Sequence, residues 1–540
     1  NWGDAQPRIG VVSLQQPAVN PLGDTRSFQE TLMSWAKEMG AAGLASREKS
    51  WHDYLRSNWK ENFHGRFGAG KTFEEFWVNT LQKGVLITGG SGGGSARSFK
   101  TASMNFVPKY SKSEAGVKLA AYAKVSMGDG RSANNAWLQE LPDPISTITW
   151  DNYLNIGPTL AKNLSLQNGD VVEVSGGNQQ LRLPVWVQPG LNANTVSAAV
   201  GYGRTGAGRI GDGVGQNIFT FGRVSSKGWV LSGQTVSIKK TGARYNLAAT
   251  QGHHKTEGRP IINDITLDEF KENPATENHT NPHMRMKEVP TLWPKHEYKG
   301  HKWVMGIDLN SCTGCGACVT ACQAENNIPV VGRDRVRVSR EMHWIRIDRY
   351  YAGSPENPDV VFQPMLCQHC DNAPCETVCP VLATTHSTEG LNDMTYNRCV
   401  GTRYCQNNCP YKVRRFNFFD HWKEYRDPMN RVYNPDVTVR TRGVMEKCTF
   451  CVQRIQDAKG KAKDEGRSLR DGELKTACQQ TCPTEAIVFG DINNAESRVA
   501  KIHKDPRAFR VLEALNARPS ISYLTKVRNK EEGAAHVEHH

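Results

Sequence analysis

All fifteen cysteines of this chain lie between Cys312 and Cys482, and the first 311 residues contain none. An odd number of cysteines cannot all pair in closed disulfides within one chain, so metal binding is the better use for them. At roughly 100–200 residues per domain, the 540 residues predict three or four domains. The confinement of the cysteines predicts that the two halves of the chain do different chemistry.

The cysteines form four groups with short, repeated spacings. The groups are Cys312, Cys315, Cys318 and Cys322; Cys367, Cys370, Cys375 and Cys379 before Pro380; Cys399, Cys405 and Cys409 before Pro410; and Cys448, Cys451, Cys478 and Cys482 before Pro483. Zinc is the competing interpretation, because C-x2-C pairs also build tetrahedral zinc sites. Three cysteines spaced by two, then a fourth after three and a proline, are typical of bacterial ferredoxins. Four such groups, intact or nearly so, favour iron-sulfur clusters.

The third group lacks one cysteine. Counting C-x2-C from Cys399 places the missing ligand at Thr402. A hydroxyl is a poor substitute for a thiolate on a soft iron site. The sequence therefore predicts a 3Fe-4S cluster here, with a 4Fe-4S cluster that takes an oxygen or water ligand as the alternative. Three sites of four cysteines and one of three use all fifteen.

Residues 1 to about 140 are expected to be mixed helix and loop. Apolar residues recur at helical spacing in residues 27–39 and 50–62, and they are expected to pack cores; they include Phe28, Leu32, Trp35, Trp51, Leu55 and Trp59. The glycine-rich residues 89–95 follow a short apolar run but lack a Lys-Ser/Thr pair, which favours a flexible loop over a phosphate loop. Asn1 is not followed by a signal pattern, so we expect the chain to be processed or incomplete at its start.

Residues 141 to about 237 consist of short β-branched segments punctuated by Gly, Pro and Asn, which predicts a compact barrel or sandwich. A helical interruption at residues 157–164 precedes the Gly169-Asp170 turn. The segment resembles the C-terminal barrel domain of molybdopterin-dinucleotide oxidoreductases at residues 150–152, 169–170, 189–190 and 201–204. Residues 240–300 are polar and contain prolines, and they are expected to form a linker. His279 and His283 are expected to lie in a solvated loop rather than at a metal.

The C-terminal 240 residues resemble the four-cluster electron-transfer subunits of complex iron-sulfur molybdoenzymes and polysulfide reductases. They more closely resemble the iron-sulfur subunits of alternative complex III, a membrane-bound quinol oxidoreductase in which such a domain follows a molybdopterin-enzyme-like domain. The resemblance is carried by residues 342–350, 365–370 and 394–405. It implies a multidomain α+β protein with a double-psi-type β-barrel before a ferredoxin-like domain.

The expected domains follow from the barrel and the cysteines. They are a C-terminal portion of a molybdopterin-oxidoreductase-like domain at 1–140, the barrel at 141–240, the linker at 241–300, the four-cluster domain at 301–500 and a tail at 501–540. The resemblance also implies crossed ligation, in which the last cysteine of each group joins a partner group. The implied 4Fe-4S ligand sets are Cys312, Cys315, Cys318 and Cys482; Cys322, Cys448, Cys451 and Cys478; and Cys367, Cys370, Cys375 and Cys409. Cys379, Cys399 and Cys405 are left for the 3Fe-4S site.

The resemblance implies an electron-transfer subunit that relays electrons from quinol toward haem c or a terminal oxidase, with no catalytic site of its own and no molybdopterin. The implied partners are an integral-membrane quinol-binding subunit and multihaem and monohaem cytochrome c subunits, on the periplasmic side of a bacterial inner membrane. The alternative is the electron-transfer part of a molybdopterin oxidoreductase such as a polysulfide or tetrathionate reductase. A soluble polyferredoxin is a third possibility.

The composition limits other functions. The mean hydropathy of −0.56 and the lack of a long apolar run argue against a membrane-embedded chain. The formal net charge is +13, but four oxidised clusters with their thiolates would contribute about −8 and leave about +5. The basic residues near the third group, among them Arg398, Arg403, Lys412, Arg414 and Arg415, are therefore expected to offset cluster charge or dock a subunit, and not to bind nucleic acid.

Overall fold

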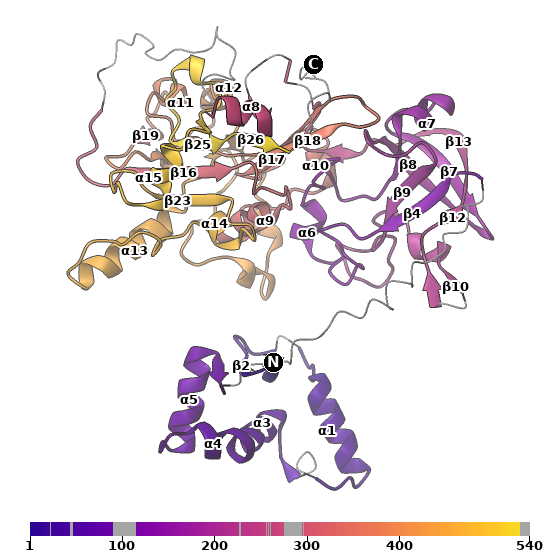
Figure 1. Cartoon of the computed structure of the whole chain (residues 1–540), viewed down its shortest axis with the longest axis vertical. Coiled ribbons are helices and arrows are strands. Elements are labelled where there is room, and N and C mark those ends of the chain that lie inside the picture. The colour runs from indigo at the N-terminus through magenta and orange to yellow at the C-terminus, as the bar shows by residue number, and fades with distance from the viewer. Residues whose placement is uncertain are drawn as a thin grey trace. The chain divides into compact units, whose positions relative to one another are not determined.

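The computed structural model describes residues 1–21, 23–43, 47–89, 115–225, 228–254, 256–257, 259, 261–274, 294 and 296–529. The chain divides into two compact units, Asn1–Ser113 and Glu114–His540 (Figure 1). The cysteines all belong to the second.

The first unit combines a small sheet with helices. β1 (Gly3–Arg8), β2 (Val11–Gln15) and β3 (Val85–Ile87) pair antiparallel in the order β1-β2-β3. Val12 and Leu14 alternate inward from β2 and meet a core of Leu55, Trp59, Phe76 and Trp77. The helices are α1 (Phe28–Glu38), α3 (Trp51–Trp59), α4 (Gly65–Phe67) and α5 (Phe73–Lys83). The predicted helix-and-loop region thus also contains a sheet.

The core prediction holds for α3 and is wrong for α1. Leu55 and Trp59 are fully buried, whereas Phe28, Leu32 and Trp35 are 69%, 43% and 59% exposed. Helix α1 buries Met33 instead. Helical spacing identifies an apolar face, but it does not supply an element to cover that face. Of the glycine-rich segment, residues 90–95 lie outside the described residues.

The predicted barrel region of the second unit is a seven-stranded sheet in the order β12-β4-β9-β6-β8-β7-β13. Only Val236 separates β12 from β13, yet these strands lie at opposite edges, so one extended segment closes the sheet upon itself. The strands are β4 (Lys118–Tyr122), β6 (Leu154–Ile156), β7 (Asp170–Gly176), β8 (Gln179–Val187), β9 (Thr195–Ala199), β12 (Gln234–Thr235) and β13 (Ser237–Arg244). The double-psi connectivity stays a prediction.

The bounds of this region differ from the sequence prediction, whereas its helix agrees with it. Strand β4 precedes residue 141 and β13 continues past residue 240, so the sheet extends beyond the expected boundaries on both sides. The expected helical interruption is α7 (Pro158–Asn163), which begins after Gly157. A hairpin of β10 (Arg223–Ser225) and β11 (Gly228–Val230) projects from the sheet.

The expected linker contributes strands to both neighbouring regions. β14 (Ala248–Ala249) pairs with β5 (Ile148–Thr149), and β15 (Asp264–Thr266) pairs parallel to β26 (Lys526–Arg528). Helix α8 (Leu267–Glu272) follows β15 with a Thr266 capping box. His279 and His283 lie outside the described residues.

The cysteine-rich region is built on a second sheet, in the order β23-β16-β25-β24. The strands are β16 (Trp303–Asp308), β23 (Ile487–Asp491), β24 (Ala508–Phe509) and β25 (Ile521–Leu524). β16 lies centrally, antiparallel to β23 and parallel to β25. Strands β24 and β25 belong to the segment expected as a tail, and Ile521 and Tyr523 are fully buried. The tail therefore completes the core of this region.

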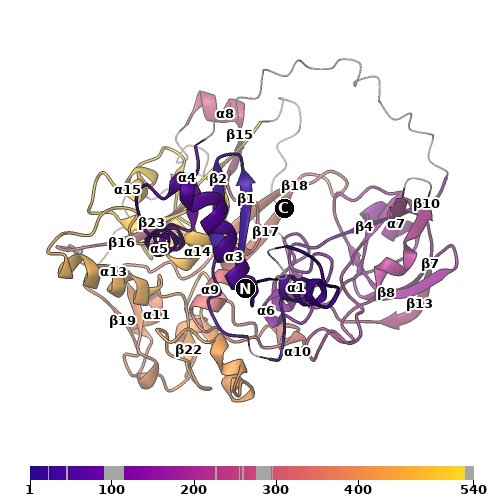
Figure 2. The same ribbon diagram turned by 90° about the horizontal axis from the view of Figure 1, so that it is seen from below.

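Short hairpins and helices carry the cysteine loops around this sheet (Figures 1 and 2). The hairpins are β17 (Arg346–Ala352) with β18 (Asp359–Met365) and β19 (Thr384–His386) with β20 (Asn392–Met394). A further antiparallel pair joins β21 (Arg415–Phe416) to β22 (Met445–Glu446). The helices are α9 (Ala317–Glu325), α11 (Pro374–Thr377), α12 (Tyr404–Asn407), α13 (Val452–Asp464), α14 (Ala477–Thr481) and α15 (Arg498–His503).

The barrel lies beside the cysteine-rich region, with α6 (Ala136–Glu140) and α10 (Arg333–Val336) between them (Figures 1 and 2). The buried Glu140 carboxylate accepts hydrogen bonds from the amides of Val331 at 3.0 Å and Gly332 at 2.7 Å. Leu141 packs into the same hydrophobic core as the cysteines. These contacts join the two regions firmly within the second unit.

Candidate metal centres

The first cysteine group lies on a tight loop that leads into α9. Gly314 and Gly316 both adopt positive φ, +70° and +78°, which lets the chain wrap closely. A Cβ at Gly314 would lie 2.7 Å from the Phe362 ring, so a side chain does not fit there. Cys318 and Cys322 then lie one turn apart on α9. The sequence therefore presents two thiols, Cys312 and Cys315, on the loop and two on the following helix.

The first and fourth groups come together where α9 contacts α14. Burial raises the pKa of the Cys318 thiol well above its ordinary value, and four neighbouring thiols raise it further: Cys478, Cys312, Cys315 and Cys482. Burial likewise raises the pKa of Cys312 to about 11, with Cys482 and Cys315 among its neighbours. These contacts bring together the first ligand set that the resemblance implies.

The second implied set lies next to the first. Burial raises the pKa of Cys322 well above normal, and its neighbouring thiols are Cys448, Cys451 and Cys478. Backbone amides point at these sulfurs: Phe450 N lies 3.4 Å from Cys448 Sγ, and Ala477 N lies 3.5 Å from Cys451 Sγ. Amides of this kind stabilise negative charge on cluster sulfur and influence its potential.

The second and third groups come together where α11 contacts α12. Burial raises the pKa of Cys370 well above normal, and the neighbouring thiols are Cys367, Cys375 and Cys409. These four residues are the third implied set. All four are buried.

Cys379, Cys399 and Cys405 line one cavity together with Thr402. The side chain at the position of the missing ligand thus faces the same space as the three thiols. Cys379 and Cys399 are half-buried. Burial would raise the pKa of Cys379, but the amides of Val381, Ala383 and Thr384 outweigh it and hold the pKa below its usual value. These amides therefore favour the thiolate form of Cys379.

Two buried cations beside these thiols test whether the sites suit anionic clusters. Arg414 is 1% exposed and Lys447 is fully buried, and within the described chain neither forms an ion pair with a carboxylate. Lys447 Nζ donates to the Cys448 carbonyl at 2.7 Å, and Arg414 Nη2 lies 3.1 Å from Cys375 Sγ. A buried charge without a counter-ion is costly. Negatively charged clusters would supply the missing counter-charge, so the residues fit iron-sulfur centres.

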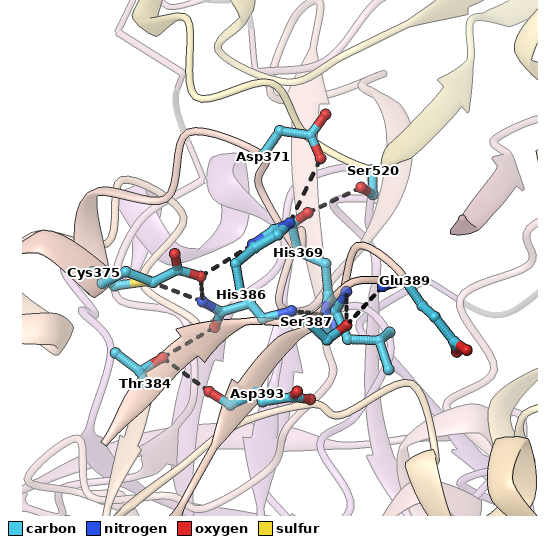
Figure 3. A network of polar contacts seen from close by, with 12 residues as sticks. His369, Asp371, Cys375, Thr384, His386, Ser387, Glu389, Asp393 and Ser520 are labelled. Carbon is cyan, nitrogen blue, oxygen red and sulfur yellow. Dashed lines mark hydrogen bonds and ion pairs between the residues drawn. The ribbon is translucent and has the colours of Figure 1, made fainter. Parts of the chain in front are cut away.

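The two halves of the cysteine-rich region meet at His369. Its ring stacks on Phe450 with centroids 3.9 Å apart, which joins the loop of Cys367 and Cys370 to that of Cys448 and Cys451. His369 Nδ1 accepts from Asn392 N at 3.0 Å, and its carbonyl accepts from Ser520 Oγ at 2.9 Å (Figure 3). Burial, Lys447 and other cations hold its pKa well below the ordinary value. His369 is therefore a neutral packing residue between the loops.

A polar network lies next to the residues of α11 (Figure 3). His386 lies 3.2 Å from Glu376 and 2.8 Å from the Tyr298 hydroxyl, which donates to Asp371 at 2.9 Å. Asn392 donates to Glu376. The network fixes the hairpin β19-β20 against the helix that carries Cys375.

The predicted basic cluster divides into three kinds of contact. Arg414 reaches sulfur, Arg415 pairs with the buried Glu341 at 2.8 Å, and Arg403 lies over the rings of Phe416 and Phe418. The sequence did not distinguish these roles. Lys447, Thr384 and Asn392 were not predicted either. The position of Lys447 next to Cys448 could have indicated its role, whereas no sequence signal marked Thr384 or Asn392.

Two kinds of site are absent from the described residues. No helix among them is both long and apolar enough to cross a membrane. In the same part of the chain, no three histidine, cysteine, aspartate or glutamate side chains surround a position for a single metal ion.

Known proteins match the cysteine-rich region. The family described as "4Fe-4S dicluster domain" matches residues 311–383, and a second family of that description matches residues 358–425. The iron-sulfur cluster-binding subunit of menaquinone reductase from Nitratidesulfovibrio vulgaris is 47% identical over 231 residues, 42% of this chain and 89% of the relative. Iron-sulfur subunit 1 of an Hdr-like menaquinol oxidoreductase from Archaeoglobus fulgidus is 34% identical over 43% of this chain and 86% of its own length.

Two further matches differ in how similar they are to this chain. A subunit of tetrathionate reductase from Salmonella typhimurium is 34% identical over 42% of this chain and 72% of that protein. The solved structure of acetylene hydratase from Pelobacter acetylenicus aligns with 44% of this chain and 36% of its own, at 14% identity and a TM-score of 0.32. That TM-score is too low to define a fold.

The cysteine loops, their buried cations and the dicluster matches define an iron-sulfur electron-transfer protein. More narrowly, the chain belongs to the family of iron-sulfur subunits that serve quinol oxidoreductases and molybdoenzyme reductases. The matched part is the C-terminal region, and the barrel and the first unit lie outside it.

Proposed function

We propose that this chain is the iron-sulfur subunit of a membrane-bound quinol oxidoreductase of the alternative complex III type. It relays electrons one at a time from quinol toward haem c or a terminal oxidase. The proposed cofactors are three 4Fe-4S clusters and one 3Fe-4S cluster, held by the four implied ligand sets. Iron-sulfur clusters supply one-electron exchange, and the chain positions them and excludes water.

The linear order of the four thiol sets carries this proposal. The set of Cys312 adjoins that of Cys322 across α9 and α14, because Cys478 neighbours both Cys318 and Cys322. Cys448 neighbours Cys367, which links the second set to the third. Arg414 contacts both Cys375 and Cys405, which links the third set to the fourth. The order supports a relay with two ends.

Both ends of the relay approach the surface, whereas its middle is buried. Cys312, Cys315 and Cys482 are half-buried at one end, as are Cys379 and Cys399 at the other. The thiols of the two middle sets are 6–8% exposed. An electron can therefore enter and leave at the ends without passing through open solvent between them.

The end at Cys379 and Cys399 is the proposed entry point from quinol. Exposed apolar side chains surround it: Leu382 is 63% exposed, Val400 66% and Tyr404 59%. Grouped exposed apolar residues are typical of a surface that docks a partner. The proposed partner here is the integral-membrane quinol-binding subunit, and cytochrome c subunits would accept electrons beyond the other end. The proposal therefore includes a peripheral position for the chain, on the periplasmic side of the inner membrane.

The barrel is proposed as a scaffold that carries no pterin. Leu141 lies over the first cysteine loop, with its Cδ1 3.1 Å from where a Cβ on Gly316 would be. Arg333 Nη1 lies 3.6 Å from Asp151 Oδ1 and donates to the Tyr245 hydroxyl at 2.5 Å; both partners belong to the barrel region. These contacts support the loop without presenting a catalytic group.

Metal analysis and EPR on the anaerobically purified native complex test the proposal. We expect one 3Fe-4S signal in the oxidised state, further 4Fe-4S signals on reduction, and a 3Fe-4S potential within reach of the quinol couple. Absence of the 3Fe-4S signal, or a potential far below quinol, would contradict the proposed entry point. Co-purifying subunits identify the partners.

The second candidate is the electron-transfer part of a molybdopterin oxidoreductase. The barrel and the 34% identity to a tetrathionate reductase subunit support it. Molybdenum or tungsten in stoichiometric amounts in the purified complex would favour this candidate and contradict the scaffold role. Copurification with a separate large molybdenum subunit would do the same.

A further inference from the structure

Arg414 is a buried arginine whose hydrogen-bond partners include sulfur. Its Nη2 lies 3.1 Å from Cys375 Sγ, 2.8 Å from Thr384 Oγ1 and 2.7 Å from Asn392 Oδ1. The hairpin β19-β20 supplies Thr384 and Asn392, so two uncharged acceptors fix the guanidinium in place. The orientation does not depend on a carboxylate.

Two other arginines of this domain, one half-buried and one buried, pair with a carboxylate. Arg415 pairs with Glu341 at 2.8 Å, and Arg440 pairs with the fully buried Glu446 at 2.8 Å. Within the described chain Arg414 forms no such pair, although its side chain is as deeply buried. Its charge must be balanced by something else.

The same guanidinium reaches a second thiol. Burial raises the pKa of Cys405, and the Arg414 guanidinium, which hydrogen-bonds that thiol, opposes the rise. Cys375 and Cys405 belong to different implied sets. Arg414 therefore lies near a sulfur ligand of each of two adjacent sites, donating to Cys375 at one and lying close to Cys405 at the other.

We propose that Arg414 is a shared counter-charge that raises the reduction potentials of both the Cys375 site and the Cys405 site and reduces the repulsion between them. A fixed cation in a low-dielectric interior favours the more negative, reduced state of each neighbouring centre. Because the guanidinium donates to Cys375 and lies near Cys405, its removal affects both centres. Arg414 acts here as a positioning residue with an electrostatic role.

The test is a potentiometric EPR titration of the full chain in its native complex, with Arg414→Met, Arg414→Lys and Lys412→Asn. We expect Arg414→Met to shift the ratio of reduced to oxidised centre at least tenfold toward oxidised at both sites, about 59 mV for a one-electron couple. Arg414→Lys keeps the charge but replaces the planar guanidinium with a compact ammonium, so it should shift the two sites by unequal, smaller amounts. Lys412→Asn removes an exposed charge two residues away, at a position with φ of 51°, and should leave both potentials within the error of the titration.

Each outcome decides the proposal. Wild-type potentials at both sites in a fully loaded Arg414→Met variant would overturn it, and a shift confined to one site would overturn the shared role. An equal shift in Lys412→Asn would reduce the effect to general charge. If Arg414→Met fails to assemble, Arg414→Gln, which also removes the charge, takes its place, and wild-type potentials at both sites in that variant overturn the proposal. The inference rests on the ligand sets above, whose own failure would appear as missing EPR signals in the wild-type complex.

Discussion

The two halves of the cysteine-rich region share one plan and differ at their outer ends. In each half, two short helices meet, α9 with α14 and α11 with α12, and each pair brings two cysteine groups together. The first half has a cysteine at every ligand position, whereas the second has Thr402 at one. The barrel covers the outer end of the first half through Leu141, and exposed apolar residues surround that of the second. The same arrangement of loop and helix therefore forms both a braced end, which the barrel covers, and an open end, which exposed apolar residues surround.

The largest expected effect is the loss of a cluster, which should harm the protein more in the first half than at the outer end of the second. Cys478 lies at the contact between α9 and α14, close to both Cys318 and Cys322. We expect Cys478→Ser to lose one four-iron cluster and most of the soluble protein, because it disturbs two adjacent sites in the core. The half-buried Cys399, changed to Ser, should lose only the 3Fe-4S signal. Iron content, EPR and yield measure the difference, and equal losses in the two variants would remove it.

The next largest effect is expected from a substitution that gives the second half the ligand it lacks. Thr402→Cys places a fourth thiol in the cavity that Cys379, Cys399 and Cys405 line. We expect the 3Fe-4S signal of the oxidised protein to disappear almost completely, with a 4Fe-4S signal in its place on reduction and a lower potential. Thr402→Ser serves as the matched control and should keep the wild-type signal. Retention of the 3Fe-4S signal in Thr402→Cys would mean that the side chain at 402 does not decide the cluster type.

Much of the metal site was predictable from spacing, because a ferredoxin loop fixes its thiols locally. Cys312 to Cys322 occupy eleven residues, and the positive φ of Gly314 and Gly316 follows from the same short loop. Thr402 stands out by the same local counting. Long-range contacts were not predictable in this way. The pairing of the groups had to be taken from a resemblance, and Arg414 could not be separated from Arg415 by sequence.

The limits of the fold prediction have the same cause. The tail strand β25 is separated from its partner β16 by over 200 residues, and β4 joins the barrel from before its expected start. Helix α1 shows the reverse case. Its helical spacing predicted that Phe28, Leu32 and Trp35 would be buried, but all three are exposed. Periodicity describes one element, while burial depends on what the rest of the chain places against it.

A smaller effect tests how the barrel braces the first half. Glu140 accepts from the amides of Val331 and Gly332 and, at 3.3 Å, from Trp150 Nε1. Glu140→Ala leaves these buried donors unpaired and should cost about 3 kcal/mol of unfolding free energy. Glu140→Gln keeps an acceptor and should cost under about 1 kcal/mol. Thermal unfolding followed by tryptophan fluorescence measures both, and equal costs would show that the hydrogen bonds do not matter.

The same carboxyl gives a pH dependence with a definite sign. Burial raises the pKa of Glu140 from 4.5 to about 7, and the amides only partly oppose this. The folded protein therefore holds the proton more tightly than the unfolded chain does. Its stabilising contribution is complete below about pH 4.5 and is lost as the pH rises through 7. Wild-type stability should fall across this window relative to Glu140→Gln, and parallel pH profiles would contradict the assignment.

The smallest effect compares the packing of the two outer ends directly. Leu141 is 6% exposed and lies against the first cysteine loop, so Leu141→Ala should cost about 2 kcal/mol through lost burial and the cavity left behind. Val400 is 66% exposed at the other end, and Val400→Ala should change stability by less than about 0.5 kcal/mol. Heating that follows the visible iron-sulfur absorption should show earlier bleaching only for Leu141→Ala. Earlier bleaching in Val400→Ala would mean that the open end is packed as firmly as the braced one, and its apolar rim would then belong to the fold rather than to a docking surface.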